Sequence, residues 1–316
     1  MSNFITNYTI FLLLIFSLES CSQNSKNTSL IYLADNYKEF PYSIYEPNKE
    51  FKLKKELREI SGLTYIKDHI LLCINDEKGI IYQYNWKKEK ITRKIKFGKS
   101  GDYEGIELVD SLVYVLRSDG TIFKVNPINE NNISAKKQKT FLNEGNNTEG
   151  LGYDPMDNSL LIACKGLPGK INVYKGQRAI YKYYLKNNYL SEAPFLLIDQ
   201  EQIRNILGFN SYLDFSVKLL ETIVPAEGDL TFQPSAVAIN PVTGNLYVLG
   251  SVGKLLLVIH PDGTILSVVK LKRKIFRQPE GICFTPNGTM FISNEGKGGK
   301  ATILEFKYNN MKKTEN

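Results

Sequence analysis

The fold of this chain is decided by the stretch Thr148-Glu149-Gly150-Leu151-Gly152-Tyr153, because the chain repeats it. Close copies begin at Tyr103 and Pro279, and weaker copies begin at Ile60 and Pro234. We take the residue before the small glycine or alanine of each copy as its repeat mark. The repeat marks fall at positions 61, 104, 149, 235 and 280. A period of about 40 to 45 residues with short β-type runs inside each unit is typical of propeller blades. The interval of 86 between the third and fourth marks is twice the first interval of 43, so we expect a sixth, degenerate blade near position 192.

The expected architecture is all-β, a six-bladed β-propeller of four-stranded antiparallel blades. A single blade cannot bury both of its faces, so the units must close into a ring. The unit after Pro279 shows only three strands, and the run Tyr42–Leu53 precedes the first complete blade. We therefore expect this N-terminal strand to complete the last blade and close the ring. The region 190–233 fits the repeat poorly, and within it Asp199–Leu207, followed by Gly208, predicts a short helix.

The N-terminus has the features of an export signal. Residues 8–18 form an apolar run of 11 residues, which is too short to span a bilayer comfortably and suits a signal-peptide core. The run ends in Leu18-Glu19-Ser20-Cys21, which resembles a bacterial lipobox with cleavage before Cys21 and palmitate-type lipid on its thiol. No Lys or Arg precedes the run, so an uncleaved N-terminus or a signal without lipid is the alternative. We expect a signal peptide at 1–20, a tether at 21–40, the propeller at 41–309 and a polar tail at 310–316.

Cysteine usage and charge exclude several classes of site. The remaining cysteines, Cys73, Cys164 and Cys283, lie in apolar runs. Three is an odd number and no Cys-x-x-Cys spacing occurs, so we expect buried free thiols and neither a disulfide framework nor a zinc site. The net charge of +7 is spread over short lysine pairs, which argues against nucleic-acid binding. The two histidines, His69 and His260, fall in different blades, which argues against a histidine-based triad.

Propeller topology predicts where a binding site would lie. In an antiparallel blade the start of the first strand and the end of the second lie at the same end, and the innermost strand lines the central channel. Glu104, Glu149 and Glu280 each open a first strand, so we expect them to converge on one mouth. The residues that end the second strands should join them there, namely Asn75, Asp76, Arg117, Lys165, Asn294 and Glu295.

The expected mouth has two interpretations. Each glutamate can accept hydrogen bonds from neighbouring backbone N–H groups and so fix the start of its blade. Alternatively, the carboxylates repel one another unless a cation or a ligand compensates them. Hard oxygen ligands of this kind suit calcium or magnesium. Arg117 and Lys165 could also neutralise the ring without any metal.

The repeated motifs together resemble the SdiA-regulated family of six-bladed propellers. The resemblance covers the chain from Glu59 to Phe306, and its motifs are Glu59-Ile60-Ser61-Gly62-Leu63, Asp102-Tyr103-Glu104-Gly105-Ile106, Asn147-Thr148-Glu149-Gly150-Leu151, Pro234-Ser235-Ala236-Val237 and Gln278-Pro279-Glu280-Gly281-Ile282. A lipobox followed by this domain is similar to lipoprotein versions of the family. The resemblance implies exposure outside the cytoplasm and suggests bound calcium, but it implies no established reaction.

We expect a membrane-anchored, extracytoplasmic propeller in a bacterial cell envelope. The acylated Cys21 would hold it to the lipid bilayer, and its acidic mouth would bind a small molecule, a glycan or a protein, through calcium in one version. One alternative is a metal-dependent hydrolase of the lactonase, esterase or phosphohydrolase type, in which a carboxylate acts as base. Another is a scaffold whose lateral loops bind protein. Fold alone cannot choose between them.

Overall fold

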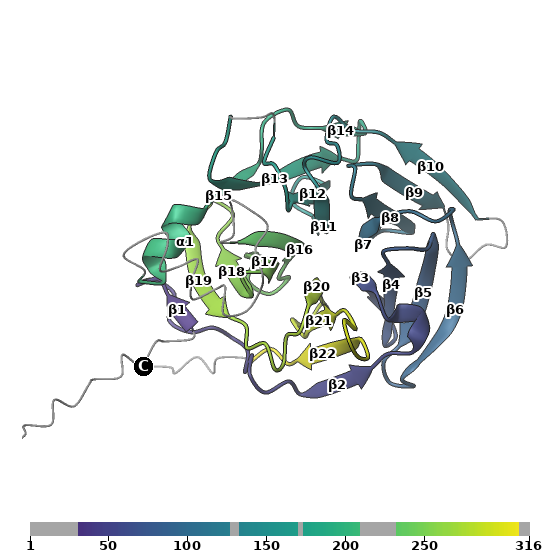
Figure 1. The fold of residues 1–316 in the computed structure, drawn as a ribbon, viewed down its shortest axis with the longest axis horizontal. Coiled ribbons are helices and arrows are strands. Elements are labelled where there is room, and N and C mark those ends of the chain that lie inside the picture. The colour runs from purple at the N-terminus through teal and green to yellow at the C-terminus, as the bar shows by residue number, and fades with distance from the viewer. Residues whose placement is uncertain (1–30, 127–132, 170–172, 209–231, 310–316) are drawn as a thin grey trace, which may run out of the picture.

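The computed structural model describes residues 31–126, 133–169, 173–208 and 232–309. Within them, five antiparallel sheets stand in a ring around a central axis (Figure 1). Nearest the axis lie β3 (Ile60–Lys67), β7 (Tyr103–Val109), β11 (Thr148–Asp154), β16 (Gln233–Ile239) and β20 (Pro279–Phe284). Each of these innermost strands contacts the next, and β20 contacts β3, so the ring is closed. We name each blade by its innermost strand.

The strands of each blade follow one another from the axis to the rim. The β3 blade continues with β4 (Ile70–Asn75), β5 (Ile80–Asn85) and β6 (Lys90–Lys96), and the β7 blade with β8 (Leu112–Arg117), β9 (Ile122–Asn126) and β10 (Ser134–Gln138). The β11 blade continues with β12 (Ser159–Cys164) and β13 (Gln177–Tyr184), and both β14 (Tyr189–Leu190) and β15 (Leu196–Asp199) pair with β13. The β16 blade has β17 (Leu246–Val252), β18 (Leu255–Ile259), β19 (Ile265–Lys270) and β1 (Ile31–Leu33). The β20 blade has β21 (Met290–Asn294), β22 (Thr302–Phe306) and β2 (Lys49–Lys52).

The expectation of six blades is wrong, because the described residues form five. The first part of the region 190–233 adds β14 and β15 to the rim of the β11 blade instead of starting a new sheet. A helix, α1 (Gln200–Ile206), follows, and the Asp199 side chain caps it by accepting a hydrogen bond from the Glu201 N–H, as the sequence predicts. Strand β11 contacts β16 directly, which leaves no place for a further blade at the axis. The rest of the expected fourth blade, residues 209–231, lies outside the described residues.

Two N-terminal strands occupy rim positions. Strand β2 pairs with β22 from Lys49 opposite Glu305 to Lys52 opposite Thr302, so the predicted closure of the last blade by an N-terminal strand is confirmed. A short 3-10 turn at Lys55–Leu57 then leads into β3. Strand β1, which lies within the range expected to be a tether, pairs with β19. These two strands cover sheet edges that would otherwise be open to pairing with another chain.

The repeat itself has a steric cause at the axis. Every repeat mark lies at a β-bulge in the pairing of a first strand with its second strand. The small residue after the mark meets the neighbouring innermost strand: a Cβ on Gly105 would lie 2.4 Å from the Cβ of Leu151, and one on Gly62 would lie 3.1 Å from the carbonyl oxygen of Glu104. Larger side chains would force the innermost strands apart. The bulge re-aims the side chain of the mark itself.

The hydrophobic core lies between the blades. In the interface between the β3 and β7 blades, Leu72, Ile74, Val113 and Val115 are fully buried. Each such side chain contributes about 2 kcal/mol by leaving water. Within the described ranges, no helix combines the length and apolar character needed to cross a membrane.

The expectation of buried free thiols is confirmed for the three cysteines in the described residues, Cys73, Cys164 and Cys283. Burial raises the pKa of the Cys73 thiol well above its usual range. These thiols therefore behave as small apolar groups and not as nucleophiles.

Candidate functional site

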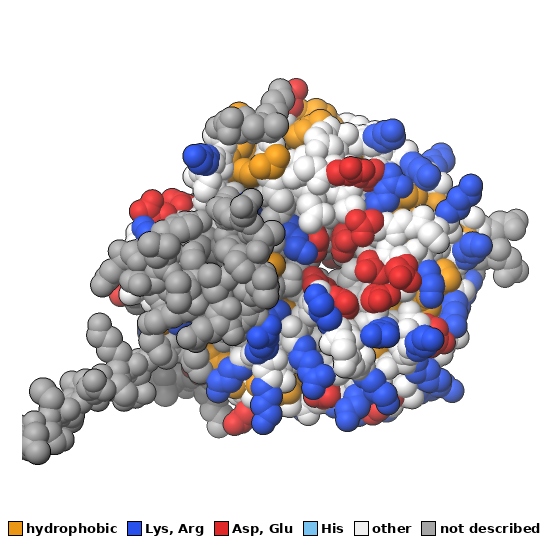
Figure 2. Space-filling view, in the orientation of Figure 1, with side chains coloured by type: hydrophobic (Ala, Val, Ile, Leu, Met, Phe, Trp, Pro, Cys, Tyr) orange, Lys and Arg blue, Asp and Glu red, His pale blue; other side chains and the backbone are white. Residues whose placement is uncertain are grey.

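The structure brings the three glutamate marks to one end of the central channel. They line a cavity of about 150 Å³ whose wall consists of Glu59, Ile60, Ser61, Asp76, Glu104, Glu149, Lys165, Gln278, Glu280 and Glu295. Figure 2 shows acidic side chains gathered at the centre of this face, with Lys and Arg side chains around them. We call this cavity and its wall the acidic mouth. All five carboxylates predicted from the sequence line it, and so does Lys165, one of the two predicted cations. Glu59 is a sixth carboxylate, which the sequence analysis did not predict.

The placement of Arg117 at the mouth needs correction. Arg117 is not among the residues that line the cavity, and its guanidinium forms two hydrogen bonds with Asp119, at 2.9 and 2.5 Å. The cause is strand register, because a shift of one residue turns a side chain to the other face. In three blades the mouth residue of the second strand is the one whose N–H donates to the carbonyl two residues before the repeat mark: Asp76 to Glu59, Lys165 to Asn147 and Glu295 to Gln278. In the β7 blade the same hydrogen bond runs from Ser118 to Asp102, although Ser118 does not line the cavity. Arg117 lies one residue before such a position.

Asn75 and Asn294 occupy the same register as Arg117 in their own blades, and they are likewise absent from the lining of the cavity. The Asn75 side chain accepts a hydrogen bond from the Lys78 N–H at 3.1 Å. The Asn294 amide donates to the Ile275 carbonyl and to the Thr302 hydroxyl, both at 3.3 Å. Both asparagines therefore stabilise loops next to the mouth.

The strongest polar contact in the mouth joins Lys165 to Glu149. The Lys165 Nζ lies 2.9 Å from the Glu149 Oε1, and the Asn147 amide donates to the same oxygen at 3.2 Å. The Glu149 side chain is 7% exposed and that of Lys165 is 23% exposed. Burial acts to lower the pKa of Lys165, but the carboxylates of Glu149, Glu280 and Glu104 raise it by more. Lys165 therefore stays charged and holds the centre of the acidic ring together.

Burial and mutual repulsion make the mouth carboxylates weak acids. Burial is the largest cause that raises the pKa of Glu104, and the charges of Glu149 and Asp102 raise it further. Burial also raises the pKa of Glu149, although Lys165 opposes that effect. The pKa of Glu280 rises to about 7 because of burial first and the Glu149 charge second. Several of these carboxyls therefore bind protons near neutral pH, since their negative charges are incompletely compensated.

The β3 side of the mouth shows the same effect. The pKa of Asp76 rises to about 6, through burial first and then the charges of Glu59 and Glu295. The pKa of Glu295 is raised as well, chiefly by burial. The Asp76 Oδ1 is buried and has no hydrogen-bond partner among the residues that the structure describes. A buried acceptor of this kind is expensive to leave unpaired, so it is available to a donor from outside the chain.

The serine and glutamate repeat marks form different kinds of hydrogen bond. The Ser61 hydroxyl donates to the Tyr103 carbonyl at 2.6 Å, and the Ser235 hydroxyl donates to the Pro279 carbonyl at 2.9 Å, so each serine links two neighbouring blades. In contrast, none of the glutamate marks accepts a hydrogen bond from a backbone N–H within the described residues; Glu149 is bonded to the side chains of Lys165 and Asn147. The serine marks therefore stabilise the starts of their blades through hydrogen bonds to the backbone, whereas the glutamate marks do not.

Two polar residues of the mouth, and one lysine close to Glu280, were not predicted from the sequence. Glu59 and Gln278 line the cavity and lie two residues before a repeat mark. The corresponding residue is polar in all five units, which is a signal that could have found them. Lys254 lies in the tight turn Gly253-Lys254 between β17 and β18 and does not line the cavity; burial lowers its pKa to about 8, while the Glu280 charge opposes that shift. No sequence pattern pointed to Lys254.

The wall of the mouth carries donor atoms of the kind that bind metal ions. Its carboxylates are the hard oxygen donors that calcium and magnesium prefer. Among the described residues, however, no three Asp, Glu, His or Cys side chains lie close enough together to hold a metal ion. The donor chemistry therefore fits a divalent cation, whereas the described side chains are not grouped to hold one.

Comparisons with known proteins agree with the fold. The profile of the family described as SdiA-regulated matches residues 42–297, and no curated protein matches the chain. The solved glutaminyl cyclase of Myxococcus xanthus is similar with a TM-score of 0.53 and 13% identity, over 84% of this chain and 97% of that one. A luciferin-regenerating enzyme gives a TM-score of 0.47 and 14% identity over the same two shares. The virginiamycin B lyase of Staphylococcus aureus gives 0.42 and 13%, over 82% of this chain and 73% of that one. At 13% identity the likeness to the glutaminyl cyclase concerns the fold alone.

Proposed function

The chain belongs to the SdiA-regulated family, and we propose that it is a ligand-binding β-propeller whose acidic mouth binds a cationic group. The observation that carries the proposal is the charge imbalance of the cavity. Among the residues that the structure describes, six carboxylates line it and Lys165 is the one lining cation. A cation that enters stabilises the ionised form of the carboxylates around it, so Asp76 and Glu280, whose pKa values are raised, should release protons as it binds.

The size of the mouth supports a small group. Its volume of about 150 Å³ is below the roughly 300 to 1,000 Å³ of pockets that enclose whole drug-sized ligands. An ammonium or guanidinium group at the tip of a ligand fits this space and brings hydrogen-bond donors. The unpaired Asp76 Oδ1 would accept from one of them. The rest of the ligand would lie outside the channel.

Calcium is the second candidate occupant. The resemblance to the family suggests it, and the oxygen donors support it. Because the carboxylates are spread around the wall, calcium would require at least two of them to approach a common point. The hydrolase alternative depends on such an ion, so it stands or falls with metal binding.

Isothermal titration calorimetry on the full chain tests the proposal. The probes are agmatine, which carries an ammonium and a guanidinium group, and Ca²⁺, with acetate as an anionic control. We expect agmatine to bind and Glu104→Gln or Glu149→Gln to weaken it at least tenfold. The matched control is Glu50→Gln, which removes an exposed carboxylate on the outermost strand β2. Absence of binding for both cations, or equal affinity in all variants, would contradict the proposal; binding of Ca²⁺ alone would favour the metal.

We also propose that lipid on Cys21 anchors the propeller to a membrane of the bacterial envelope. The support comes from the sequence, since Cys21 lies outside the described residues. Strand β1 begins at Ile31, ten residues after Cys21, and a fully extended chain of that length spans at most about 35 Å. The propeller would therefore stay close to the bilayer surface.

A further inference from the structure

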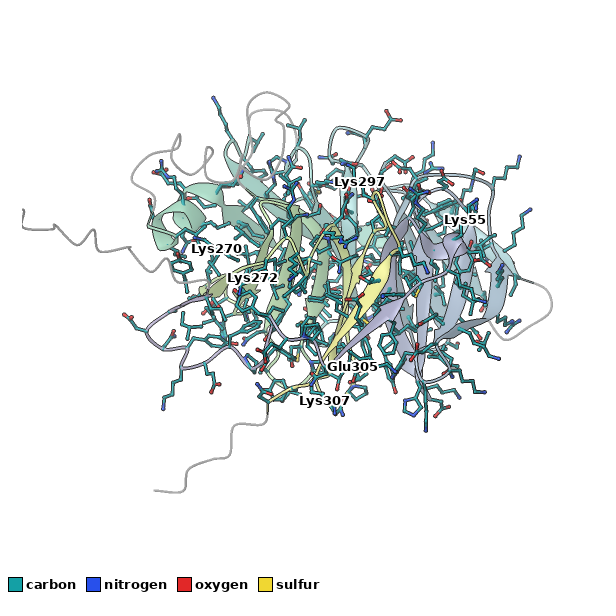
Figure 3. The ribbon with its side chains drawn as sticks, turned by 60° about the horizontal axis from the view of Figure 1, so that its bottom comes forward. Lys55, Lys270, Lys272, Lys297, Glu305 and Lys307 are labelled. Carbon is teal, nitrogen blue, oxygen red and sulfur yellow. The ribbon has the colours of Figure 1, made fainter. Side chains whose placement is uncertain are left out.

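We propose that a second groove, at the end of the propeller opposite the acidic mouth, binds a sugar ring against Trp86. The groove has a volume of about 600 Å³ and lies between the β3 and β20 blades. Its wall is built from the β3–β4 hairpin, from Trp86 after β5, from the turn before β21 and from the end of β22. The groove therefore lies where first strands end and second strands begin. The mouth lies at the other end of the propeller, where first strands begin and second strands end. In Figure 3, Glu305 and Lys307 of this groove lie far from Lys297, which belongs to the loop after β21. The inference is independent of the function proposed for the mouth.

Trp86 forms a fixed aromatic platform in the groove. It is the only tryptophan of the chain, and its ring is partly exposed. Phe291 packs against it with ring centroids 5.0 Å apart, His69 meets it edge-on at 5.2 Å, and Tyr65 lies at 6.0 Å. An indole held on several sides keeps one orientation and loses little entropy when a ligand binds. A flat apolar face of this kind suits the C–H face of a sugar ring.

The hairpin beside Trp86 is not optimised as a turn. Asp68 and His69 have φ values of 47° and 65°, so both lie in the left-handed region of this two-residue turn. Asn-Gly or Asp-Gly is the preferred pair at such a turn, and a non-glycine residue at the second position costs stability. His69 packs on Trp86 from this position. The strained turn therefore places the His69 ring against the platform.

The polar groups around the platform suit hydroxyl groups and not a strong charge. The carboxylates of Asp68 and Glu305 line the groove, and neither forms an ion pair within the described residues. Lys307 lines the same groove and offsets one of the two carboxylates, which leaves a formal charge of −1, and Asn287 and Thr289 add donors and acceptors. Carboxylates and amides beside an apolar ring can bind the hydroxyl groups of a sugar while its ring lies on the indole. The mouth, by contrast, has a strong excess of negative charge.

Intrinsic fluorescence tests the proposal directly, because Trp86 is the only tryptophan. The full chain is titrated to about 10 mM, a range that detects millimolar binding, with maltohexaose, cellohexaose and chitohexaose. We expect a saturable change in emission with at least one of them. The near-isosteric double variant Asp68→Asn/Glu305→Gln should weaken that binding at least tenfold, while Asp68→Asn retains a residue that tolerates the left-handed region.

The matched controls are Gln138→Ala, an exposed position on the outer strand β10, and Glu104→Gln in the mouth. Both should bind the saccharide as the unchanged protein does. In Trp86→Phe, calorimetry should show lost binding, with thermal melting as the check on folding. No emission change with any of the three saccharides overturns the proposal. A change that survives in the double variant, or that Gln138→Ala weakens equally, overturns it as well.

Discussion

Replacing Lys165 by methionine should destabilise the propeller in a strongly pH-dependent way. The change removes the Nζ that lies 2.9 Å from the Glu149 Oε1 and leaves the mouth without a lining cation. Loss of one partner of a buried ion pair typically costs 3 to 5 kcal/mol. Because the Lys165 side chain is 23% exposed, we expect the lower end, about 3 kcal/mol at pH 8. For a chain of this size that corresponds to roughly 5 °C in Tm.

The sign of the pH effect follows from the carboxyl groups. Their folded-state pKa values are raised, to about 7 for Glu280 and about 6 for Asp76, so below these values the folded protein binds protons there. Protonation removes the repulsion that Lys165 offsets. The loss should therefore fall to about 1 kcal/mol or less at pH 5.

Urea unfolding at pH 5 and pH 8, followed by far-UV circular dichroism, measures the effect. Lys182→Met is the matched control, since Lys182 is bound to Asp154 at 2.8 Å and Asp157 at 2.6 Å, outside the mouth. We expect its cost to be similar at both pH values. A Lys165→Met variant that loses equal stability at pH 5 and pH 8, or none at pH 8, would refute the reasoning.

Three further perturbations test other parts of the account. Burial raises the pKa of Glu107 to about 7, so ionisation of this group costs stability as pH rises from about 4.5 to 7. Urea unfolding should show that the free energy of unfolding of Glu107→Gln, relative to that of the unchanged protein, rises by about 2 kcal/mol from pH 5 to pH 8. The same relative free energy at both pH values would speak against this role of Glu107. Gly105→Ala should cost about 3 kcal/mol because its Cβ would lie 2.4 Å from that of Leu151, whereas Gly145→Ala, an exposed control, should cost under about 0.5 kcal/mol; similar thermal shifts would disprove the steric role. Cys21→Ser should move the protein from the membrane to the soluble fraction of bacterial cells, and unchanged fractionation would exclude the lipid anchor.

The sequence predicted the propeller because the repeat reports a steric demand. Gly62, Gly105, Gly150 and Gly281 recur where neighbouring innermost strands approach too closely for a Cβ. Ring closure was predictable for a similar reason, since the last unit lacked a rim strand and Lys49–Lys52 supplies it. Both features are encoded locally and need no knowledge of distant contacts.

The number of blades was not predictable from spacing. An interval twice the period indicates either a degenerate blade or a long connection, and no local residue decides between them. The outcome depends on the pairing of β14 and β15 with β13, and on the direct contact of β11 with β16. These are tertiary contacts, so they override a count made along the chain.

The acidic mouth was predictable in outline and not in register. Topology alone places Glu104, Glu149 and Glu280 at one end of the channel. The bulge at each mark shifts the pairing of the first and second strands by one residue. As a result, the residue of the β7 blade that is equivalent to Lys165 is Ser118 and not Arg117. The small residue after each mark is typical of a bulge, but it does not tell which residue of the second strand then faces the mouth.

The pH dependence of agmatine binding tests the central claim most directly. Calorimetric titrations between pH 5.5 and pH 8.5, in buffers of different ionisation enthalpy, give the affinity and the number of protons exchanged. Because the cation requires ionised carboxylates whose pKa values are about 6 for Asp76 and about 7 for Glu280, the account predicts tighter binding at higher pH with proton release. An affinity that is flat across this range, or that falls as pH rises, would contradict it.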